Sequence, residues 1–379
     1  MKKIGILNFH YSNHNYGAVL QAAALAHKLS QLGYEAEHID YIPKKKKNIK
    51  DEIKIAISLS MDFLHLKKLV CKILGKKYIL KNEIKNEHVF EEFRAKWLKR
   101  GEDIFTNPTS LNAISDKYDA IIVGSDQVWR PKLFVNINDY YAYFLGFSSE
   151  KTKKISYAAS FGVDDWEFKN DIDFTLKIKK LIKRFHSISV REDSGVQICE
   201  KYFDIVAQHV LDPTLMVGRG FFDSIIGNEA IKNNKKISYY KLDPDINFLE
   251  RIKKISLCAG LESENIYYQD RLGMLTYNPV SEWLRKIRDS ELIITDSFHC
   301  VCFAIIFNKE FYCCVNHDRG ISRLESMLSI LGLESRLIED DMLDDSLFNK
   351  SKIDYEVINK KLNKLRETSC LYLNESLVD

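Results

Sequence analysis

The sequence predicts an α/β protein made of two Rossmann-like domains with a cleft between them. Short apolar stretches alternate with amphipathic stretches along the chain, which is typical of strand–helix–strand units around parallel sheets. The 379 residues exceed what one ordinary core needs and suit two domains. The low content of proline and glycine, 6 and 16 residues, leaves little room for long flexible linkers.

The first domain is expected over residues 1–215. It opens with a strand, a helix closed by Gly33 and a second strand, an order that predicts a parallel sheet. More apolar strands follow a basic insertion. The expected elements are strands at 2–9, 35–40, 118–126, 153–160, 185–193 and 204–209, with helices at 17–33 and 194–203.

The second domain is expected over residues 216–350, followed by a C-terminal helix within 351–379. In open parallel sheets, ligands bind in the crevice outside the carboxyl ends of the strands, so the site is expected where the two domains face each other. The expected elements are strands at 235–242, 264–270, 291–297 and 310–316, with helices at 247–260, 280–290, 299–307, 322–333 and 355–377.

The formal net charge of +3 hides a basic segment at residues 44–100. This segment holds 17 Lys and Arg against 7 Asp and Glu, so the other residues together carry a net charge of −7. Its apolar residues recur at roughly helical spacing. Such a segment is either a peripheral contact with an anionic membrane or acidic ligand, or a helical insertion whose apolar stripe packs on the domain.

Several classes of protein do not fit the sequence. No apolar run approaches the roughly 20 residues that span a bilayer, and the N-terminal apolar run is too short for a secretory signal, so we expect a cytoplasmic protein. The eight cysteines contain no C-x-x-C pair, so we expect reduced thiols and no metal site. Nucleic-acid binding is not expected, because the excess positive charge is confined to one segment.

Polar residues follow the first predicted strand. Asn13, Asn15 and Gly17 lie in a turn that leads into a helix N-terminus, where free backbone N–H groups favour an anion or a sugar hydroxyl. The spacing is not the G-x-G-x-x-G of dinucleotide-binding proteins. The alternative is a capped helix with no ligand.

The stretch "VGSDQVWRP" follows the apolar strand 118–126. Gly124 permits a tight turn, and the side chains of Ser125, Asp126 and Gln127 can hydrogen-bond a ligand. Trp129 offers a flat apolar face that suits a sugar ring. The alternative is a strand-end turn with a tryptophan in the core.

Arginines occur at two further candidate positions. Arg191, followed by Glu192 and Asp193, ends a predicted strand, and a guanidinium there suits a carboxylate or phosphate. The alternative is an ion pair with a neighbouring carboxylate. Arg319 and Arg323 are further candidates for binding an anion, or are surface charges.

The stretch "ELIITDSFHC" is a predicted buried strand that ends in Asp296, Ser297 and His299. Since a helix is expected to begin at about His299, the helix dipole disfavours the imidazolium in the empty site. A bound phosphate would offset this effect and make His299 a general acid near neutral pH. The alternative is a histidine satisfied within the core.

Seven stretches, in this order, resemble the polysaccharide pyruvyl transferases over about residues 4–335. The resemblance implies a fold of the GT-B glycosyltransferase type and transfer of the enolpyruvyl group of phosphoenolpyruvate to a sugar, with no cofactor. The stretches are "NYGAVLQAAAL", "VGSDQVW", "ISYAASFG", "SVREDSG", "VLDPTL", "TDSFHCVCFAIIF" and "SRLESMLSILGL".

The same resemblance implies roles for individual residues. His299 falls on the family's general acid and Arg191 on the arginine that binds the donor, with the first domain on the acceptor side. Cys300 replaces the usual glycine and Arg130 the usual asparagine, which puts the identity of the substrate in doubt. Ketal formation also needs a base near the acceptor hydroxyl, for which Asp126 and Asp296 are candidates.

Two other functions stay open from the sequence. One is a glycosyltransferase that uses a nucleotide sugar, because one fold can host both activities. The other is a non-catalytic protein that binds a glycan or a lipid carrier, a hypothesis based on the basic segment.

Overall fold

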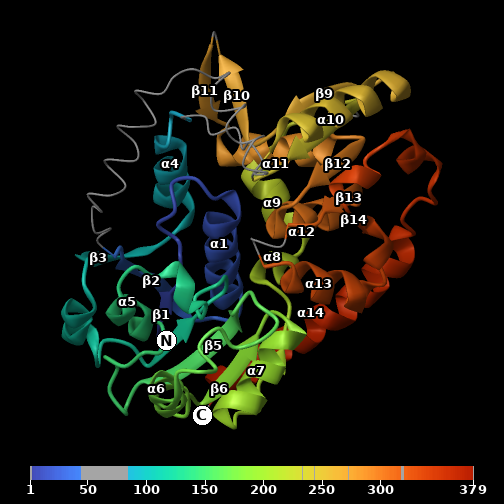
Figure 1. Cartoon of the computed structure of the whole chain (residues 1–379). Helices are drawn as coiled ribbons and strands as arrows, with labels where there is room; N and C mark the ends of the chain where they lie inside the picture. The colour runs from blue at the N-terminus through green and yellow to red at the C-terminus, as the bar shows by residue number, and fades with distance from the viewer. Residues whose placement is uncertain are drawn as a thin grey trace, which may run out of the picture.

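The computed structural model describes residues 2–43, 84–232, 234–242, 244–271, 273–316 and 320–378. It has two lobes, each built on a parallel sheet with helices against its faces (Figure 1). The predicted α/β architecture with two Rossmann-like sheets is therefore confirmed. Of the basic segment, residues 44–83 lie outside the described residues.

The first lobe holds a seven-stranded sheet in the order β3-β2-β1-β4-β5-β6-β7, with parallel pairing throughout. The strands at the centre of the sheet are buried because helices cover both faces, and all four residues of β4 are buried. The order reverses between β1 and β4, which is the topological switch point. The strands are β1 (Lys3–Leu7), β2 (Glu35–Tyr41), β3 (Arg100–Phe105), β4 (Ala120–Val123), β5 (Lys153–Ala159), β6 (Ser187–Val190) and β7 (Gln208–His209).

Four helices of the first lobe, α1, α5, α6 and α8, begin at a residue whose side chain caps the helix. The Asn15 side chain accepts from the Ala18 amide at the start of α1, and Asp171 caps α6 in the same way through Phe174. The helices are α1 (Tyr16–Gln31), α4 (His88–Trp97), α5 (Ile137–Ala142), α6 (Ile172–Ile182), α7 (Asp193–Phe203), α8 (Pro213–Val217) and α9 (Arg219–Ile226).

The second lobe holds a five-stranded sheet in the order β14-β13-β12-β8-β9, with its switch point between β8 and β12. Its strands are β8 (Lys236–Tyr240), β9 (Glu262–Asn265), β12 (Leu292–Thr295), β13 (Glu310–Cys314) and β14 (Leu337–Ile338). Its helices are α10 (Ile246–Ala259), α11 (Val280–Asp289), α12 (Phe298–Ile306) and α13 (Ser322–Leu331), and α14 (Tyr355–Leu377) follows.

The prediction of a single strand at 264–270 is wrong. The chain leaves the sheet after β9 and enters a separate antiparallel hairpin, β10 (Tyr268–Arg271) with β11 (Met274–Tyr277). The Asn265 side chain causes the turn, because its oxygen accepts from the amides of Tyr267 and Tyr268. An apolar run alone does not reveal such a turn.

One apolar core joins the two lobes. Tyr16 of α1 stacks on Trp283 of α11 with ring centroids 4.8 Å apart, and its hydroxyl donates to the Asn278 carbonyl at 2.9 Å. The described part of the basic segment joins this core, because Phe90 of α4 contacts the ring of Tyr16. The apolar face of α4 is therefore packed on the domain.

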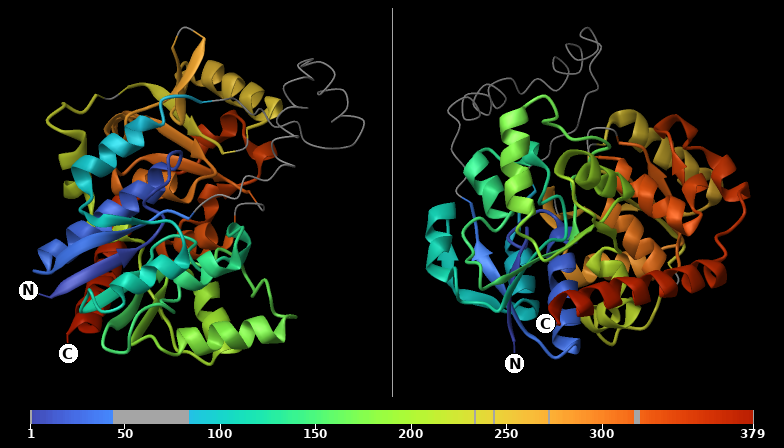
Figure 2. Two further views of the ribbon diagram at one scale, coloured as in Figure 1. Left: turned by 90° about the vertical axis from the view of Figure 1, so that its left-hand side faces the viewer. Right: turned by 90° about the horizontal axis from the view of Figure 1, so that it is seen from below.

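The C-terminal helix α14 returns to the first lobe, so both chain ends lie on one side of the molecule (Figure 2). The Tyr372 hydroxyl donates to the Ser156 carbonyl of β5 at 2.9 Å, and the Lys2 ammonium donates to the Leu377 carbonyl at 3.1 Å. Within the described residues, none of the helices has the length and apolar character needed to cross a bilayer.

Candidate active site

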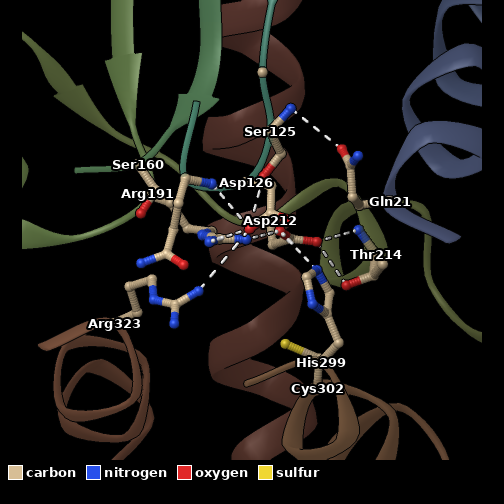
Figure 3. Close-up of polar contacts among 12 residues, drawn as sticks. Gln21, Ser125, Asp126, Ser160, Arg191, Asp212, Thr214, His299, Cys302 and Arg323 are labelled. Atoms are coloured by element: carbon tan, nitrogen blue, oxygen red, sulfur yellow. Dashed lines mark hydrogen bonds and ion pairs between the residues drawn. The ribbon is translucent and has the colours of Figure 1, made fainter. Parts of the chain in front are cut away.

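Charged side chains from both lobes meet where the carboxyl ends of the strands face each other. Asp126 follows β4, Arg191 follows β6 and Asp212 precedes α8 in the first lobe, while His299 and Arg323 stand in the first turns of α12 and α13 in the second. Figure 3 shows the two arginines and the histidine directed toward the two aspartates. This convergence defines the candidate site.

Asp212 stands at the centre of this site and is 1% exposed. Its Oδ2 accepts from Arg191 Nη1 at 2.8 Å and from Ser125 Oγ at 2.9 Å. Its Oδ1 accepts from the amide and hydroxyl of Thr214 at 2.9 and 2.7 Å, which caps α8. The sequence predicted "VLDPTL" only as part of the family resemblance, with no role for Asp212. The Asp-Pro-Thr order is a helix-start signal, but it does not reveal the arginine that the carboxylate meets.

Asp126 forms the second anionic position, and it lies between arginines of the two lobes. Its Oδ1 is 3.3 Å from Arg191 Nη2 and 4.0 Å from Arg323 Nη1. Its backbone adopts a φ of 73°, a left-handed conformation that is uncommon for residues other than glycine. Such conformations concentrate at functional sites, because surrounding structure must hold them in place.

Burial and mutual charge set the pKa values in the site. Burial alone would raise the pKa of Asp212, but His299 and Arg191 hold it well below its usual range. Burial also opposes ionisation of Asp126, yet the positive charge of Arg191 keeps the pKa of that carboxyl below its usual value. Burial and repulsion from Arg191 lower the pKa of Arg323 to about 10. The site therefore holds two carboxylates of the first lobe, Asp126 and Asp212, beside the guanidiniums of Arg191 and Arg323.

The imidazole of His299 is 6% exposed and faces the first lobe. Its Nε2 lies 3.6 Å from Asp212 Oδ2, a distance that suits an ion pair but is too long for a hydrogen bond. Gly17 of α1 covers the ring, because a Cβ at that position would overlap the imidazole. The glycine that we expected in an anion-binding turn instead lies in the helix and makes room for His299.

The aromatic ring of Phe298 lies beneath both arginines. Its centroid is 4.4 Å from the guanidinium carbon of Arg191 and 5.8 Å from that of Arg323. Cations over aromatic faces are attracted to them, most strongly when desolvated. Phe298 therefore adds to the attraction by which Asp126 holds the two like charges close together.

The polar side chains beside Arg191 and Asp126 order the surrounding loops. Glu192 Oε1 accepts from the Phe161 and Gly162 amides at 2.8 and 3.0 Å. The Gln127 side chain lies against Gly162 and Gly320, which come from different lobes. Its Nε2 is buried and has no hydrogen-bond partner among the described residues.

Two residues that the sequence predicted for the site have their side chains engaged in the fold itself. Trp129 is 0% exposed and stacks on Phe144 with centroids 5.3 Å apart, so its face is not available to a sugar. Asp296 is held by other partners of the second lobe, because its oxygens accept from the Leu242 amide at 2.9 Å and the Asn316 side chain at 2.7 Å. The alternative of a core tryptophan is correct at position 129.

Four further candidates lie at the edges of the site or outside the described residues. The Asn13 side chain accepts from Arg94 at 2.6 Å, and Asn15 caps α1. Ser297 caps α12 through the Cys300 amide, so the helix begins at Phe298 rather than His299. Arg319 lies outside the described residues.

No group of three or more histidine, cysteine, aspartate or glutamate side chains that could hold a metal ion occurs in the described part of the chain. The two carboxylates of the site are instead matched by guanidinium groups. The chemistry that these residues can perform by themselves is anion binding and proton transfer.

Residues 15–318 match the family model for polysaccharide pyruvyl transferase. The chain belongs to this family. The matched range contains the site residues up to His299, and the predicted resemblance is confirmed.

Solved structures with a similar fold belong to proteins with other functions. The S. aureus MnaA–UDP co-structure aligns with a TM-score of 0.52 at 10% identity, covering 99% of this chain and 91% of that one. A putative UDP-N-acetylglucosamine 2-epimerase from Listeria monocytogenes aligns with a TM-score of 0.50 at 11% identity, covering 95% and 90%. The predicted GT-B-type architecture is confirmed. This pyruvyl transferase family member matches none of the curated proteins.

A mutant O-GlcNAc transferase from Thermobaculum terrenum also aligns, with a TM-score of 0.48 at 12% identity. The alignment covers 99% of this chain and 66% of that one, so this chain spans slightly less than two thirds of that protein's length.

Proposed function

We propose that this protein transfers the enolpyruvyl group of phosphoenolpyruvate to a sugar of a cell-surface polysaccharide precursor, forming a cyclic pyruvate ketal and releasing phosphate. The observation that carries the proposal is the convergence of Arg191, Arg323 and His299 on one small region between the lobes. A donor with both carboxylate and phosphate groups needs several cations at such a point.

In this mechanism Arg191 and Arg323 hold the donor. Burial and the positive charge of Arg191 together lower the pKa of Arg323 to about 10. An anion with several negative charges would offset both the desolvation of Arg323 and its repulsion from Arg191. Such an anion is therefore favoured at this position over a neutral sugar. Preorganised cations of this kind usually supply the largest part of transition-state stabilisation.

His299 acts as the general acid. It protonates the methylene carbon of the donor while a sugar hydroxyl forms a bond to the neighbouring carbon. Phosphate then leaves that carbon. A second hydroxyl of the same sugar bonds to the carbon and closes the ketal, and the proton of this hydroxyl goes to the departing phosphate. Asp126 is the carboxylate that lies within 4.0 Å of both arginines, and we assign to it the proton of the attacking hydroxyl.

The direct test is mass spectrometry after incubation with phosphoenolpyruvate and a panel of hexose glycosides. The proposal expects one ketal-linked pyruvate on an acceptor, one phosphate released per ketal, and loss of both with His299→Ala. A wild-type protein that consumes no phosphoenolpyruvate with any acceptor would contradict it. Thermal stabilisation by UDP but not by phosphoenolpyruvate would favour a nucleotide-sugar glycosyltransferase.

We also propose that the acceptor is reached at the inner face of the cytoplasmic membrane through the basic segment. Residues Lys44–Lys47 lie outside the described residues, and the apolar face of α4 is occupied by the core. Because a run of four lysines is attracted to anionic lipid, sedimentation with anionic liposomes at low salt should decrease when these residues are neutralised. Equal sedimentation of both proteins would remove the membrane contact.

A further inference from the structure

The turn after β1 lies at the topological switch point of the first sheet. Residues 8–11 follow β1 and residues 124–127 follow β4, and the Asn8 side chain joins the two turns by donating to the Gly124 carbonyl at 3.3 Å. Ligands of open parallel sheets bind outside the carboxyl ends of the strands at this point. The turn after β1 is therefore the place in the first lobe to look for a second substrate.

Three half-buried aromatic side chains gather at this turn. The centroid of Phe9 is 6.1 Å from that of Tyr11 and 5.8 Å from that of Phe134, and all three residues have intermediate exposure. Beneath them Tyr143, which is fully buried, contacts Phe9 edge-on at 5.3 Å. We call Phe9, Tyr11 and Phe134 the aromatic platform.

The platform is held by buried polar contacts on both of its flanks. His10 is 0% exposed, and its Nε2 pairs with Asp40 Oδ1 at 3.0 Å. Arg94 of α4 donates to the Ser12 carbonyl at 2.9 Å and to the Asn13 side chain at 2.6 Å. Phe9 and Tyr11 are therefore presented by a turn whose neighbours are fixed, which is what a binding surface needs.

The platform also adjoins the candidate active site. The turn that carries Phe9 and Tyr11 is joined by the Asn8–Gly124 hydrogen bond to the turn that carries Asp126. Burial raises the pKa of the Tyr11 phenol to about 12, and the charges of Asp139 and Asp126 add to that rise. Tyr11 therefore remains neutral at working pH. Asp126 in turn pairs with Arg191. A molecule resting on the platform would face the carboxylate on one side and the cations beyond it.

We propose that Phe9, Tyr11 and Phe134 form the subsite for the acceptor sugar, taking the role that Trp129 cannot take because it is buried. A pyranose has an apolar C–H face and a polar hydroxyl edge, and the platform beside Asp126 offers the complement of both. This inference rests on the proposed pyruvyl transfer. The inference adds to that function the residues that hold the acceptor sugar while the hydroxyls of the sugar reach Asp126.

The test measures acceptor and donor separately. In Tyr11→Ala we expect the KM for the best hexose glycoside of a p-nitrophenyl panel to rise about fivefold to tenfold, a loss typical of one aromatic contact. Tyr11→Phe keeps the ring and should keep the KM within about twofold. Thermal stabilisation by phosphoenolpyruvate should persist in both variants, because the cations are untouched.

Tyr34→Ala is the matched control, since Tyr34 is also half-buried but lies between α1 and β2, at the opposite end of the sheet. Saturation-transfer NMR with the same glycosides should show contact in the wild type and Tyr34→Ala and about fivefold less in Tyr11→Ala. An unchanged acceptor KM in Tyr11→Ala, or no saturation transfer from the wild type to any glycoside, overturns the subsite. Loss of phosphoenolpyruvate binding by the wild type would instead overturn the proposed function.

Discussion

Two strand ends of this molecule, after β4 and after β12, both place an aspartate beside a serine. After β4, Asp126 faces Arg191 and Arg323. After β12, Asp296 instead accepts from the Leu242 amide and the Asn316 side chain, and the next helix brings His299 to the site. The comparison teaches that a polar strand end predicts where a site lies, but not which of its side chains faces the ligand.

The largest effect is expected from the loss of His299, the histidine that follows β12. Without the imidazole of His299 no acid protonates the donor, so His299→Ala should lower kcat by about 10²–10⁴-fold. The measurement is ketal formation by mass spectrometry at saturating substrates. His88→Ala on the exposed start of α4 is the control and should be unchanged. Equal activity of His299→Ala and wild type would remove the general acid.

The two aspartates can be compared by the same isosteric change. Asp126→Asn should lower kcat/KM by about 10²-fold, because it removes a carboxylate that orients two guanidiniums and accepts a proton. Asp296→Asn should instead cost about 1–3 kcal/mol of unfolding free energy through its hydrogen bonds, with the activity of the folded protein nearly retained. Denaturant titration and initial rates separate the two outcomes, and a reversed pattern would break the comparison.

Asp212 supports both strand ends, and its removal should show in stability. Asp212→Ala leaves the buried guanidinium of Arg191 without its closest partner, which should cost about 3–5 kcal/mol of unfolding free energy. The measurement is the urea midpoint at unchanged slope. Glu150→Ala, which removes the exposed partner of Arg184, is the control and should cost less than about 1 kcal/mol.

Gly17 tests how closely the first lobe packs on His299. Gly17→Ala places a methyl group against the imidazole of His299, and this overpacking should lower the unfolding free energy by about 1–3 kcal/mol. Because the methyl group displaces the imidazole, kcat should fall as well. Gly220→Ala is the matched control, because that glycine is also in the first turn of a helix, α9, and a Cβ there meets nothing within 4 Å. Equal stability and activity of the two variants would show that the histidine has room to move.

The smallest expected effect is on the pH dependence of stability, where the two aspartates should make the protein less stable as the pH falls. The folded-state pKa values of Asp126 and Asp212 lie below the ordinary value of 3.8. Their contribution is therefore present above about pH 4 and is lost as the pH falls through the lower folded values. Asp212→Asn should lose less stability than the wild type between pH 5 and 3 on thermal unfolding, and a larger loss would contradict the assignment.

The fold was largely predictable from the sequence because strand and helix periods differ clearly. The strands around residues 120–123 and 292–295 and the helix at 355–377 lie where apolar patterning places them. The hairpin β10–β11 was not predictable, because a single asparagine side chain, Asn265, turns the chain. Local patterns carry no information about that contact.

The site was predictable in location and only partly in detail. Asp126, Arg191, His299 and Arg323 could be found as polar groups after strands or at helix starts. Asp212 could not, since its importance comes from a guanidinium supplied by a distant segment. The burial of Trp129 likewise depends on partners such as Phe144 that only the folded chain brings together.

The most direct test of the account is calorimetric titration of the protein with phosphoenolpyruvate. The account predicts one site per chain, with affinity lowered at least about tenfold in Arg323→Ala and in Arg191→Lys. Arg184→Ala, which removes a guanidinium from the opposite end of β6, should bind like the wild type. Undiminished binding after loss of Arg323, or binding of UDP in place of phosphoenolpyruvate, would contradict a donor site shared by the two lobes.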